Sequence, residues 1–382
     1  MTAGLAALRG PLPPKLPNAR MLAAIRANPA CNARRVLDAA GVDKAVLAER
    51  LGRPVPEEQS KFALQRGNRF ERLVKDDNYA ELIRLLREVG YPVEAVRVLP
   101  LRDLYPINPG NPSIALATRA AETRNAIIAM AQGKPDAYNL IDGGALQWDF
   151  GGAIARLEAD GIAWRIGDRI RVVEIKSFPV VDGRADPEKV GGAAWQTAVY
   201  VAALVDLLEA QGLEPSIVSN EVLLVCAKNT SLVPTVEKID VSRQVRTLRR
   251  MLARRVTIPT ILAALPPGVT LDTAGMSDAD AAAHIADVLD TLGTNYEASC
   301  LSTCPLALHC RDTARLSGNP ACAGLDLGSV RSIGRALELA NGAPPDAAEK
   351  DIADHLLRAA RLLDQATLPT DPPRVHTKGA VA

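Results

Sequence analysis

The stretch that decides the fold is RVVEIKSF, residues 171–178, in which a glutamate and a lysine interrupt an apolar run. Side chains alternate between two faces along a strand, so Glu174 and Lys176 share one face of a predicted strand. Val173 and Ile175 take the other face, as residues of a buried strand would. An acid and a base that point the same way indicate a chemical site. An exposed ion pair on a surface strand is the alternative, and the surrounding sequence bears on the choice.

Composition favours a globular chain of moderate size. Its 382 residues are 48% hydrophobic and 23% charged, enough for one elaborated domain or two modest ones. The formal net charge is +1, so contact with nucleic acid would need local arginine patches. No apolar run approaches the roughly 18 residues of a membrane span, and the N-terminus lacks a signal-peptide pattern. With its excess of arginine over lysine, the sequence predicts a bacterial cytoplasmic protein without membrane contact.

Four parts follow one another along the chain. They are a helical part with the first Cys (1–135), a β-rich core (136–241), a helical part with the cysteine-rich stretch (242–345), and a last helix with a disordered tail (346–382). Helices are expected over residues 19–28, 29–40, 58–75, 79–89, 114–132 and 193–210. Short β-like runs fill 138–178, and another strand covers 221–227. This pattern predicts the α/β class.

The charged strand suits metal-dependent hydrolysis when an upstream acid is added. Asp160 lies 14 residues before Glu174. Two carboxylates, with the carbonyl of Ile175 between Glu174 and Lys176, form an oxygen set for a divalent ion. The ammonium of Lys176 would orient or activate the attacking water.

The order of these groups resembles the RecB-like branch of the PD-(D/E)XK nuclease superfamily, whose pattern is Asp, then Glu-x-Lys, then Gln-x-x-x-Tyr. Gln196 and Tyr200 stand at i, i+4 on a predicted helix and match the last element. Gly67 and Glu71 match its first helical motif, in which His commonly takes the second position. The resemblance implies a restriction-endonuclease-like core, a mixed sheet flanked by helices. It also implies DNA as substrate and Mg²⁺ or Mn²⁺ held by Asp160, Glu174, the Ile175 carbonyl and Glu71.

The face to which Asp160 points depends on the hairpin before Glu174. If residues 167–168 form a two-residue turn, Asp160 points to the opposite face from Glu174. An odd-length loop or a bulge would turn Asp160 toward Glu174 and bring Glu158 onto the same face. We predict that irregularity, with Glu158 and Asp149 as alternative acids.

The stretch CLSTCPLALHC contains Cys300, Cys304 and Cys310, and Cys322 follows. Three thiols this close in a cytosolic chain predict a soft-metal site, either zinc or an iron–sulfur cluster. The layout resembles the iron–sulfur subgroup of the same branch, which includes AddB-type nuclease subunits and CRISPR-associated RecB-like exonucleases. There, one Cys before the core and three after it hold a 4Fe–4S cluster that joins the chain ends.

That resemblance implies Cys31, in PACNARRVL, as the first ligand. The chain departs from the subgroup's Cys-x2-Cys, because three residues separate Cys300 from Cys304. Cys322 as the fourth ligand is the alternative, which would form a local site and favour zinc.

The function implied is a metal-dependent DNA nuclease, of exonuclease type, acting on DNA ends or single strands. Repair or recombination, CRISPR adaptation and antiphage defence are the candidate settings, with a helicase or other subunits of a complex as partners. The alternative is a non-enzymatic DNA-binding or assembly subunit with an inactive nuclease core. The basic run at residues 246–255 is interpreted as either a phosphate-binding helix or a solvated helix face.

Overall fold

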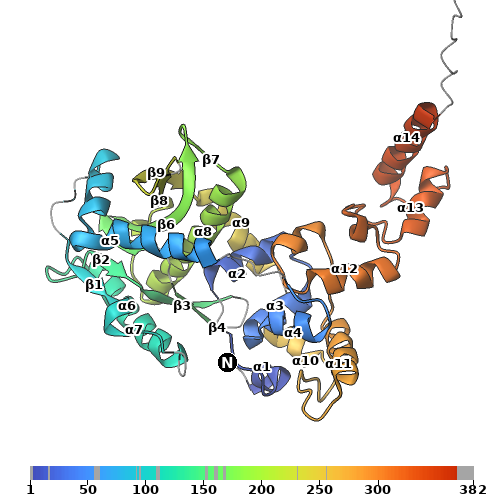
Figure 1. The fold of residues 1–382 in the computed structure, drawn as a ribbon, viewed down its shortest axis with the longest axis horizontal. Helices are drawn as coiled ribbons and strands as arrows, with labels where there is room; N and C mark the ends of the chain where they lie inside the picture. Colours follow the sequence, from blue (N-terminus) through green and yellow to red (C-terminus); the bar gives the residue numbers. More distant parts are fainter. Residues whose placement is uncertain are drawn as a thin grey trace, which may run out of the picture. The chain divides into compact units, whose positions relative to one another are not determined.

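The structure, a computed structural model, describes residues 3–15, 18–55, 61–91, 93, 96–108, 112–150, 154–158, 162–166, 169–229, 231–254 and 256–367. It divides into two compact units. The large unit is Met1–Asn295 with Ser302–Leu306, and the small unit is Tyr296–Leu301 with Ala307–Ala382. Figure 1 shows the helices and strands of both.

A seven-stranded mixed sheet forms the centre of the large unit, in the order β1-β2-β5-β6-β8-β9 with β7 paired to β6. The strands are β1 (Val98–Pro100), β2 (Leu140–Asp142), β5 (Ile162–Ile166), β6 (Arg169–Val181), β7 (Arg184–Ala185), β8 (Glu221–Lys228) and β9 (Pro234–Asp240). β6 is antiparallel to β5 and parallel to β8. A separate two-stranded sheet contains β3 (Ala145–Asp149) and β4 (Ile154–Glu158). The predicted α/β class is confirmed.

Helices cover both faces of the large sheet (Figure 1). The helices of the large unit are α1 (Ala3–Arg9), α2 (Ala19–Ala23), α3 (Asn32–Ala40), α4 (Lys44–Arg50), α5 (Lys61–Glu88), α6 (Leu101–Leu104), α7 (Pro112–Ala131), α8 (Pro187–Ala210), α9 (Ser242–Ala253), α10 (Ile258–Ala263) and α11 (Asp278–Thr291), with 3-10 turns η1 (Ala24–Ala27) and η2 (Pro215–Ile217). Most predicted helices are therefore present, with ends that differ by a few residues.

The pairing of β5 with β6 is regular, so the predicted shift of register in this hairpin is wrong. Ile166 pairs with Arg169 and Ile162 with Val173, and the register is unbroken between them. The physical reason is that an unbroken ladder pairs the backbone groups of both strands, whereas a bulge leaves one residue unpaired. Residues 159–161 lie outside the described part of the chain, so the place predicted for Asp160 stays a prediction.

The two faces of β6 are covered by different helices. Val173 and Ile175 pack in one apolar core with Phe70 and Val74 of α5. Leu224 and Cys226 of β8 face the other way and pack with Ala193 of α8. Because Glu174 pairs with Leu224 and Lys176 with Cys226 in the parallel register, the charged pair shares the face that α8 covers.

α5 is two helical pieces joined by a break. Asp76 has an extended ψ, and Asp77, Asn78 and Tyr79 have positive φ angles of 51°, 51° and 63°. The left-handed region is unfavourable for a tyrosine, so tertiary contacts must hold this backbone. The break falls where separate helices, 58–75 and 79–89, are predicted from the sequence.

α8 is the one described helix whose length and apolar composition would suit a membrane span. Most of the qualifying window is buried, because the helix packs between the sheet and α9. Its composition is that of a core helix, which is consistent with a soluble protein.

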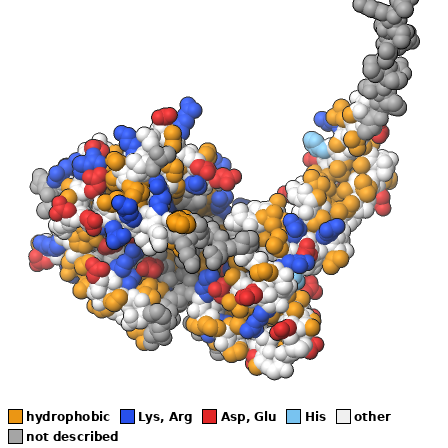
Figure 2. Space-filling model, viewed as in Figure 1, with side chains coloured by type: hydrophobic (Ala, Val, Ile, Leu, Met, Phe, Trp, Pro, Cys, Tyr) orange, Lys and Arg blue, Asp and Glu red, His pale blue; other side chains and the backbone are white. Residues whose placement is uncertain are grey.

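The small unit is built mainly from helices. Its elements are α12 (Ala307–Leu316), η4 (Pro320–Ala323), α13 (Ile333–Ala340) and α14 (Lys350–Thr367), and η3 (Ala298–Ser302) begins in it. A small core contains Val330, Leu339 and Ala353. Arg335 forms an ion pair with Glu349 at 2.6 Å, and its hydrogen bonds lower the pKa of Glu349 to about 2. Figure 2 shows hydrophobic side chains gathered along α13 and α14.

The turn after β2 allows close packing of α6. Gly143 has φ +65°, and a Cβ there would lie 2.6 Å from the Cβ of Arg102 and 2.9 Å from its backbone nitrogen. The sequence needs glycine at this position for both reasons, the backbone angle and the contact. Arg102 is thereby held beside Asp142, the last residue of β2.

We expect Gly143→Ala to lower the free energy of unfolding by about 3 kcal/mol, from left-handed strain plus a steric clash. The matched control is Gly183→Ala, because Gly183 has φ +73° but nothing within 4 Å of an added Cβ. That variant should lose about 1 kcal/mol, the strain alone. Urea unfolding measures both, and equal losses would contradict the close packing of α6.

Candidate functional site

A buried carboxylate lies at the centre of the candidate site. Glu174 is fully buried on β6, and Nζ of Lys176 lies 2.7 Å from its Oε1. The Lys176 side chain is 27% exposed, so the pair has one end in the core and one toward solvent. A buried carboxylate is costly unless it is paired or binds a cation.

Cys226 is the neighbour of Lys176 on β8. Burial raises the pKa of its thiol to about 12, while the charge of Lys176 lowers it and that of Glu174 raises it. The thiol is therefore protonated at neutral pH. This fits the core role expected for Cys226.

Gln196 and Tyr200 are brought together on α8, as the i, i+4 spacing predicts. Both are buried, and Nε2 of Gln196 donates to the Tyr200 hydroxyl at 3.3 Å. The Tyr200 hydroxyl donates to the backbone carbonyl of Glu158 at 3.0 Å. α8 therefore holds the end of β4, two residues before Asp160.

The ladder between β6 and β8 is interrupted directly after Lys176. The register shifts between Lys176 and Pro179, which leaves Ser177 outside the regular pairing. Nε of Arg66, from the first turns of α5, donates to the Ser177 carbonyl at 3.3 Å. Irregularities of this kind re-aim side chains near functional sites. Here the shift connects the Gly67 end of α5 to the charged strand.

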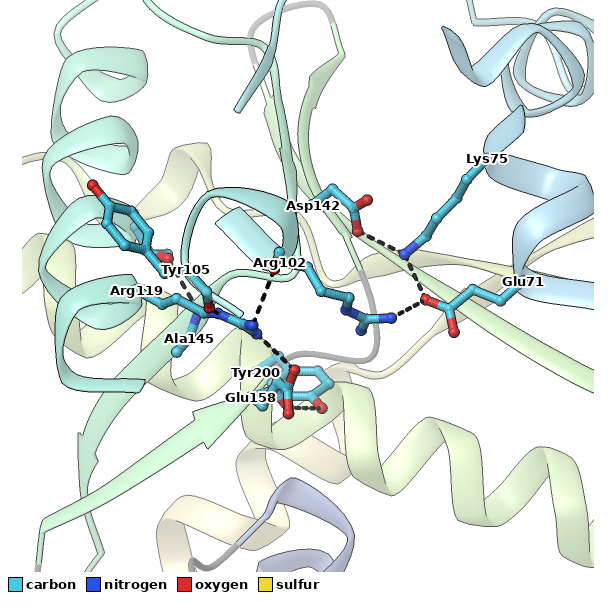
Figure 3. A network of polar contacts seen from close by, with 10 residues as sticks. Glu71, Lys75, Arg102, Tyr105, Arg119, Asp142, Ala145, Glu158 and Tyr200 are labelled. Carbon is cyan, nitrogen blue, oxygen red and sulfur yellow. Dashed lines mark hydrogen bonds and ion pairs between the residues drawn. The ribbon is translucent and has the colours of Figure 1, made fainter. Parts of the chain in front are cut away.

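Glu71 lies in a cluster of charges on the α5 side of the sheet, drawn in Figure 3. Its Oε1 accepts from Nζ of Lys75 at 2.5 Å and from a guanidinium nitrogen of Arg102 at 2.8 Å. Lys75 also donates to Oδ1 of Asp142 at 2.6 Å, and the Tyr79 hydroxyl donates to Oδ2 at 2.5 Å. Two cations thus hold the carboxylate predicted to assist the metal.

The charges of this cluster depend on one another. Burial raises the pKa of Asp142, but Lys75, the Tyr79 hydroxyl and Arg102 outweigh it, so the pKa lies below its usual range. Burial and the bond to Asp142 raise the pKa of Tyr79. Asp142 is therefore ionised and Tyr79 protonated at neutral pH. The tyrosine with positive φ is held by this bond.

Asp142 is the residue that the sequence reasoning missed. The available signal was LIDGG, an acid at the end of an apolar run before two glycines. Such a pattern is typical of an ordinary turn, and only the packing of α5 against β2 brings Lys75 and Tyr79 to it.

Arg119 connects the cluster to Tyr200. Its side chain is 1% exposed, and it donates to the Glu158 carboxylate at 2.8 Å and to the Tyr105 carbonyl at 2.8 Å. A third, longer bond of 3.4 Å reaches the Arg102 carbonyl (Figure 3). Burial lowers the pKa of Arg102, but the charges of Glu71, Asp142 and Glu158 outweigh it and the pKa is raised.

The two alternative acids belong to the small β3–β4 sheet, where Asp149 ends β3 and Glu158 ends β4. The predicted set is thus divided. Gln196, Tyr200 and Glu158 are bonded to one another, and Glu71 joins them through Arg102 and Arg119. No group of three or more His, Cys, Asp or Glu side chains that could hold a metal ion occurs within the described ranges, which leave out Asp160.

The cysteines fall in both units, and none of the six forms a disulfide. In the large unit, burial lowers the pKa of Lys44 to about 8. Cys304 and Cys31 lie near its ammonium and act in the opposite direction, raising that pKa. The Cys31 sulfur accepts from the Arg34 backbone and caps α3. In the small unit, Cys300, Cys310 and Cys322 all lie near Tyr296, whose pKa is raised first by burial and then by these thiols.

The surroundings of Cys31 and Cys304 suit an anionic group. Arg34 and Lys44 are buried cations there, while Asp38 is the buried acid paired with both. Thiolate sulfurs are ligands of zinc and of iron–sulfur clusters, so the soft-metal site stays a prediction for these cysteines.

No protein-family model, curated protein or solved structure matches the chain. The function must therefore come from the site itself, because a fold alone does not specify chemistry.

The ion pair of Lys75 with Asp142 should stabilise the fold far more than a surface pair on the same helix. In a double-mutant cycle with Lys75→Met and Asp142→Asn, we expect a coupling of about 2 kcal/mol at pH 7. Because the folded pKa of Asp142 is lowered, this stability is present above 3.8 and is lost as the pH falls through the folded pKa.

The control cycle is Arg84→Met with Glu88→Gln, an exposed pair on α5. It should show at most a few tenths of a kcal/mol, because solvent screens exposed charges. Urea unfolding at pH 7, 3 and 2 provides the measurements. Equal coupling in the two cycles would refute the role given to Lys75.

Proposed function

We propose that this protein is a metal-dependent DNA nuclease of the RecB-like PD-(D/E)XK type. The observation that carries the proposal is the buried Glu174, paired with Lys176 on the face of a central strand that α8 covers. That same helix contains the bonded pair Gln196 and Tyr200. The order of these four residues along the chain, and their positions on β6 and on the helix that covers it, support the proposal.

The architecture supports the proposal. Strands β2, β5, β6 and β8 form a mixed sheet between α5 and α8. A mixed sheet flanked by helices is what the resemblance implies for the nuclease core. Since folds are shared by unrelated functions, this agreement supports the proposal, and the residues of the site carry it.

The described residues on either side of Asp160 are both held by contacts with elements of the candidate site. The Glu158 carbonyl is bound to Tyr200, and Ile162 pairs with Val173, the neighbour of Glu174. Asp160 itself lies outside the described residues, and its place beside Glu174 belongs to the proposal.

In this proposal each residue has one task. Glu174, Asp160 and the Ile175 carbonyl would hold Mg²⁺ or Mn²⁺, which supplies Lewis-acid polarisation of the phosphate and a more acidic water. Lys176 orients the attacking water, and Tyr200 keeps the segment before Asp160 in place. Because Lys75 and Arg102 already bind the Glu71 oxygen, the task of Glu71 is to hold these two cations and not to ligate the ion.

The cysteines complete the proposal. We assign Cys31, Cys300, Cys304 and Cys310 to a structural 4Fe–4S cluster, with the buried Arg34 and Lys44 balancing its negative charge. The protein would work on DNA ends or single strands in the bacterial cytoplasm, in a repair, CRISPR adaptation or defence complex that includes a helicase.

The full-length protein should cleave labelled single- or double-stranded DNA with Mg²⁺ or Mn²⁺. Lys176→Met and Glu174→Gln should each lower the rate on the order of 100-fold or more while DNA binding is retained. Lys228→Met, at an exposed position of β8, is the control and should cleave normally.

Two results would count against this function. Tight DNA binding by the wild-type chain without cleavage in either metal would favour the non-enzymatic subunit. Cleavage by Glu174→Gln at the wild-type rate would remove Glu174 from the site. Urea unfolding of each variant shows whether lost activity reflects lost structure.

Cys31→Ala should remove the iron and its visible absorption, whereas Cys322→Ala should keep both. Cys226→Ala is the control, because Cys226 lies in the core between β8 and α8. Retained iron in Cys31→Ala together with loss in Cys322→Ala would show a local site. Purification with zinc and no iron would exclude the cluster.

A further inference from the structure

α9 has a row of arginines on its exposed side. Arg243, Arg246 and Arg250 are exposed, as is Arg254 at the C-cap. Their spacing of three, four and four residues places them on one stripe of the helix. The opposite side of the helix is apolar, and its residues Val245 and Leu248 are both buried. The stripe thus runs the length of α9.

Acidic residues do not neutralise this stripe. The helix sequence SRQVRTLRRMLA contains no Asp or Glu. Arg249 lies off the stripe and pairs with Asp206 of α8 at 2.5 Å, so it docks the helix. Among the described residues, none of the four stripe arginines forms an ion pair with a carboxylate.

One acid lies close to the start of the stripe. Asp240 accepts from the backbone and hydroxyl of Ser242, and these bonds, followed by the charge of Arg246, lower its pKa. Both bonds go to its Oδ1, at the start of α9. Four guanidinium groups therefore face solvent together in a chain whose formal net charge is only +1.

We infer that this stripe binds the phosphate backbone of the nucleic-acid substrate. The inference rests on the proposed function for the identity of that substrate. Guanidinium groups bind phosphate oxygens in a bidentate way, and they keep their charge at every physiological pH. From Arg243 to Arg254 the helix rises about 16 Å, the length of roughly five nucleotides of a B-form strand.

The character of the stripe selects this partner among anionic ones. It holds no aromatic side chain for base stacking, so contacts would be to phosphate and independent of sequence. The apolar residues Val245 and Leu248 are buried under the helix and cannot enter a lipid layer, as a membrane-surface helix requires. An acidic protein is the alternative partner, and the salt dependence of DNA binding distinguishes it from nucleic acid.

The stripe belongs to the same body as the candidate site. α9 packs on α8, joined by Arg249 and Asp206, and Asp206 also accepts from Trp148 of β3 at 2.8 Å. α8 contains Gln196 and Tyr200. The stripe therefore supplies affinity at a fixed position relative to the site, and its loss should weaken binding without changing the rate at saturating DNA.

The test measures binding of labelled DNA to the full chain in EDTA, so that cleavage cannot interfere, at 50 to 300 mM salt. The variant replaces Arg243, Arg246, Arg250 and Arg254 with Gln. For duplex DNA the slope of log K against log salt should become shallower by about 3.6, which is 0.9 for each of the four lost phosphate contacts. Affinity should fall on the order of 100-fold at low salt. The double variant R243Q/R250Q should show about half of this change in slope.

The control removes four exposed arginines elsewhere: Arg84, Arg97, Arg358 and Arg361. It changes the net charge equally, so it should keep the wild-type slope if position matters. An unchanged slope in the α9 variant would overturn the inference, and so would equal changes in variant and control. Unfolding curves identify any variant that has lost its fold, and the double variant then decides.

The outcomes separate this inference from the proposed function. DNA binding that depends on α9, without cleavage in Mg²⁺ or Mn²⁺, would support phosphate binding by the stripe and overturn the nuclease function. Cleavage with a salt slope that does not depend on α9 would support the nuclease function and overturn phosphate binding by the stripe. Absence of DNA binding by the wild-type chain would overturn the inference.

Discussion

The structure depends on the burial of one carboxylate in the central sheet. Glu174 is inside β6 with Lys176 2.7 Å away, and the cost of removing the acid from water must be met by the fold around it. The apolar core of α5 and the buried face of α8 supply that stabilisation on either side. Under the proposed function, this buried acid would hold a cation for hydrolysis.

A second polar system connects helices and strands of the large unit. It runs from Lys75 and Asp142 through Arg102 and Arg119 to Glu158, whose carbonyl meets Tyr200. Each member is held by at least one other member, so the network fixes α5, α6, α7, β4 and α8 relative to one another. The break in α5 belongs to this system, because Tyr79 reaches Asp142 from a left-handed backbone.

α8 contacts the strands and helices on which both proposals depend. One side buries apolar residues against β6 and β8, one position presents Tyr200 to β4, and its later turns bind α9 through Asp206. Substrate binding on α9 and chemistry beside Glu174 would then depend on a single rigid helix.

The sequence by itself determined the class of the fold, most elements, and the shared face of Glu174 and Lys176, because periodicity and turn residues are local properties. It also placed Gln196 beside Tyr200, since helical spacing fixes that pair. It could not place Asp142 or predict a regular β5–β6 hairpin. Those features come from contacts between residues distant in sequence, where packing decides which polar groups meet.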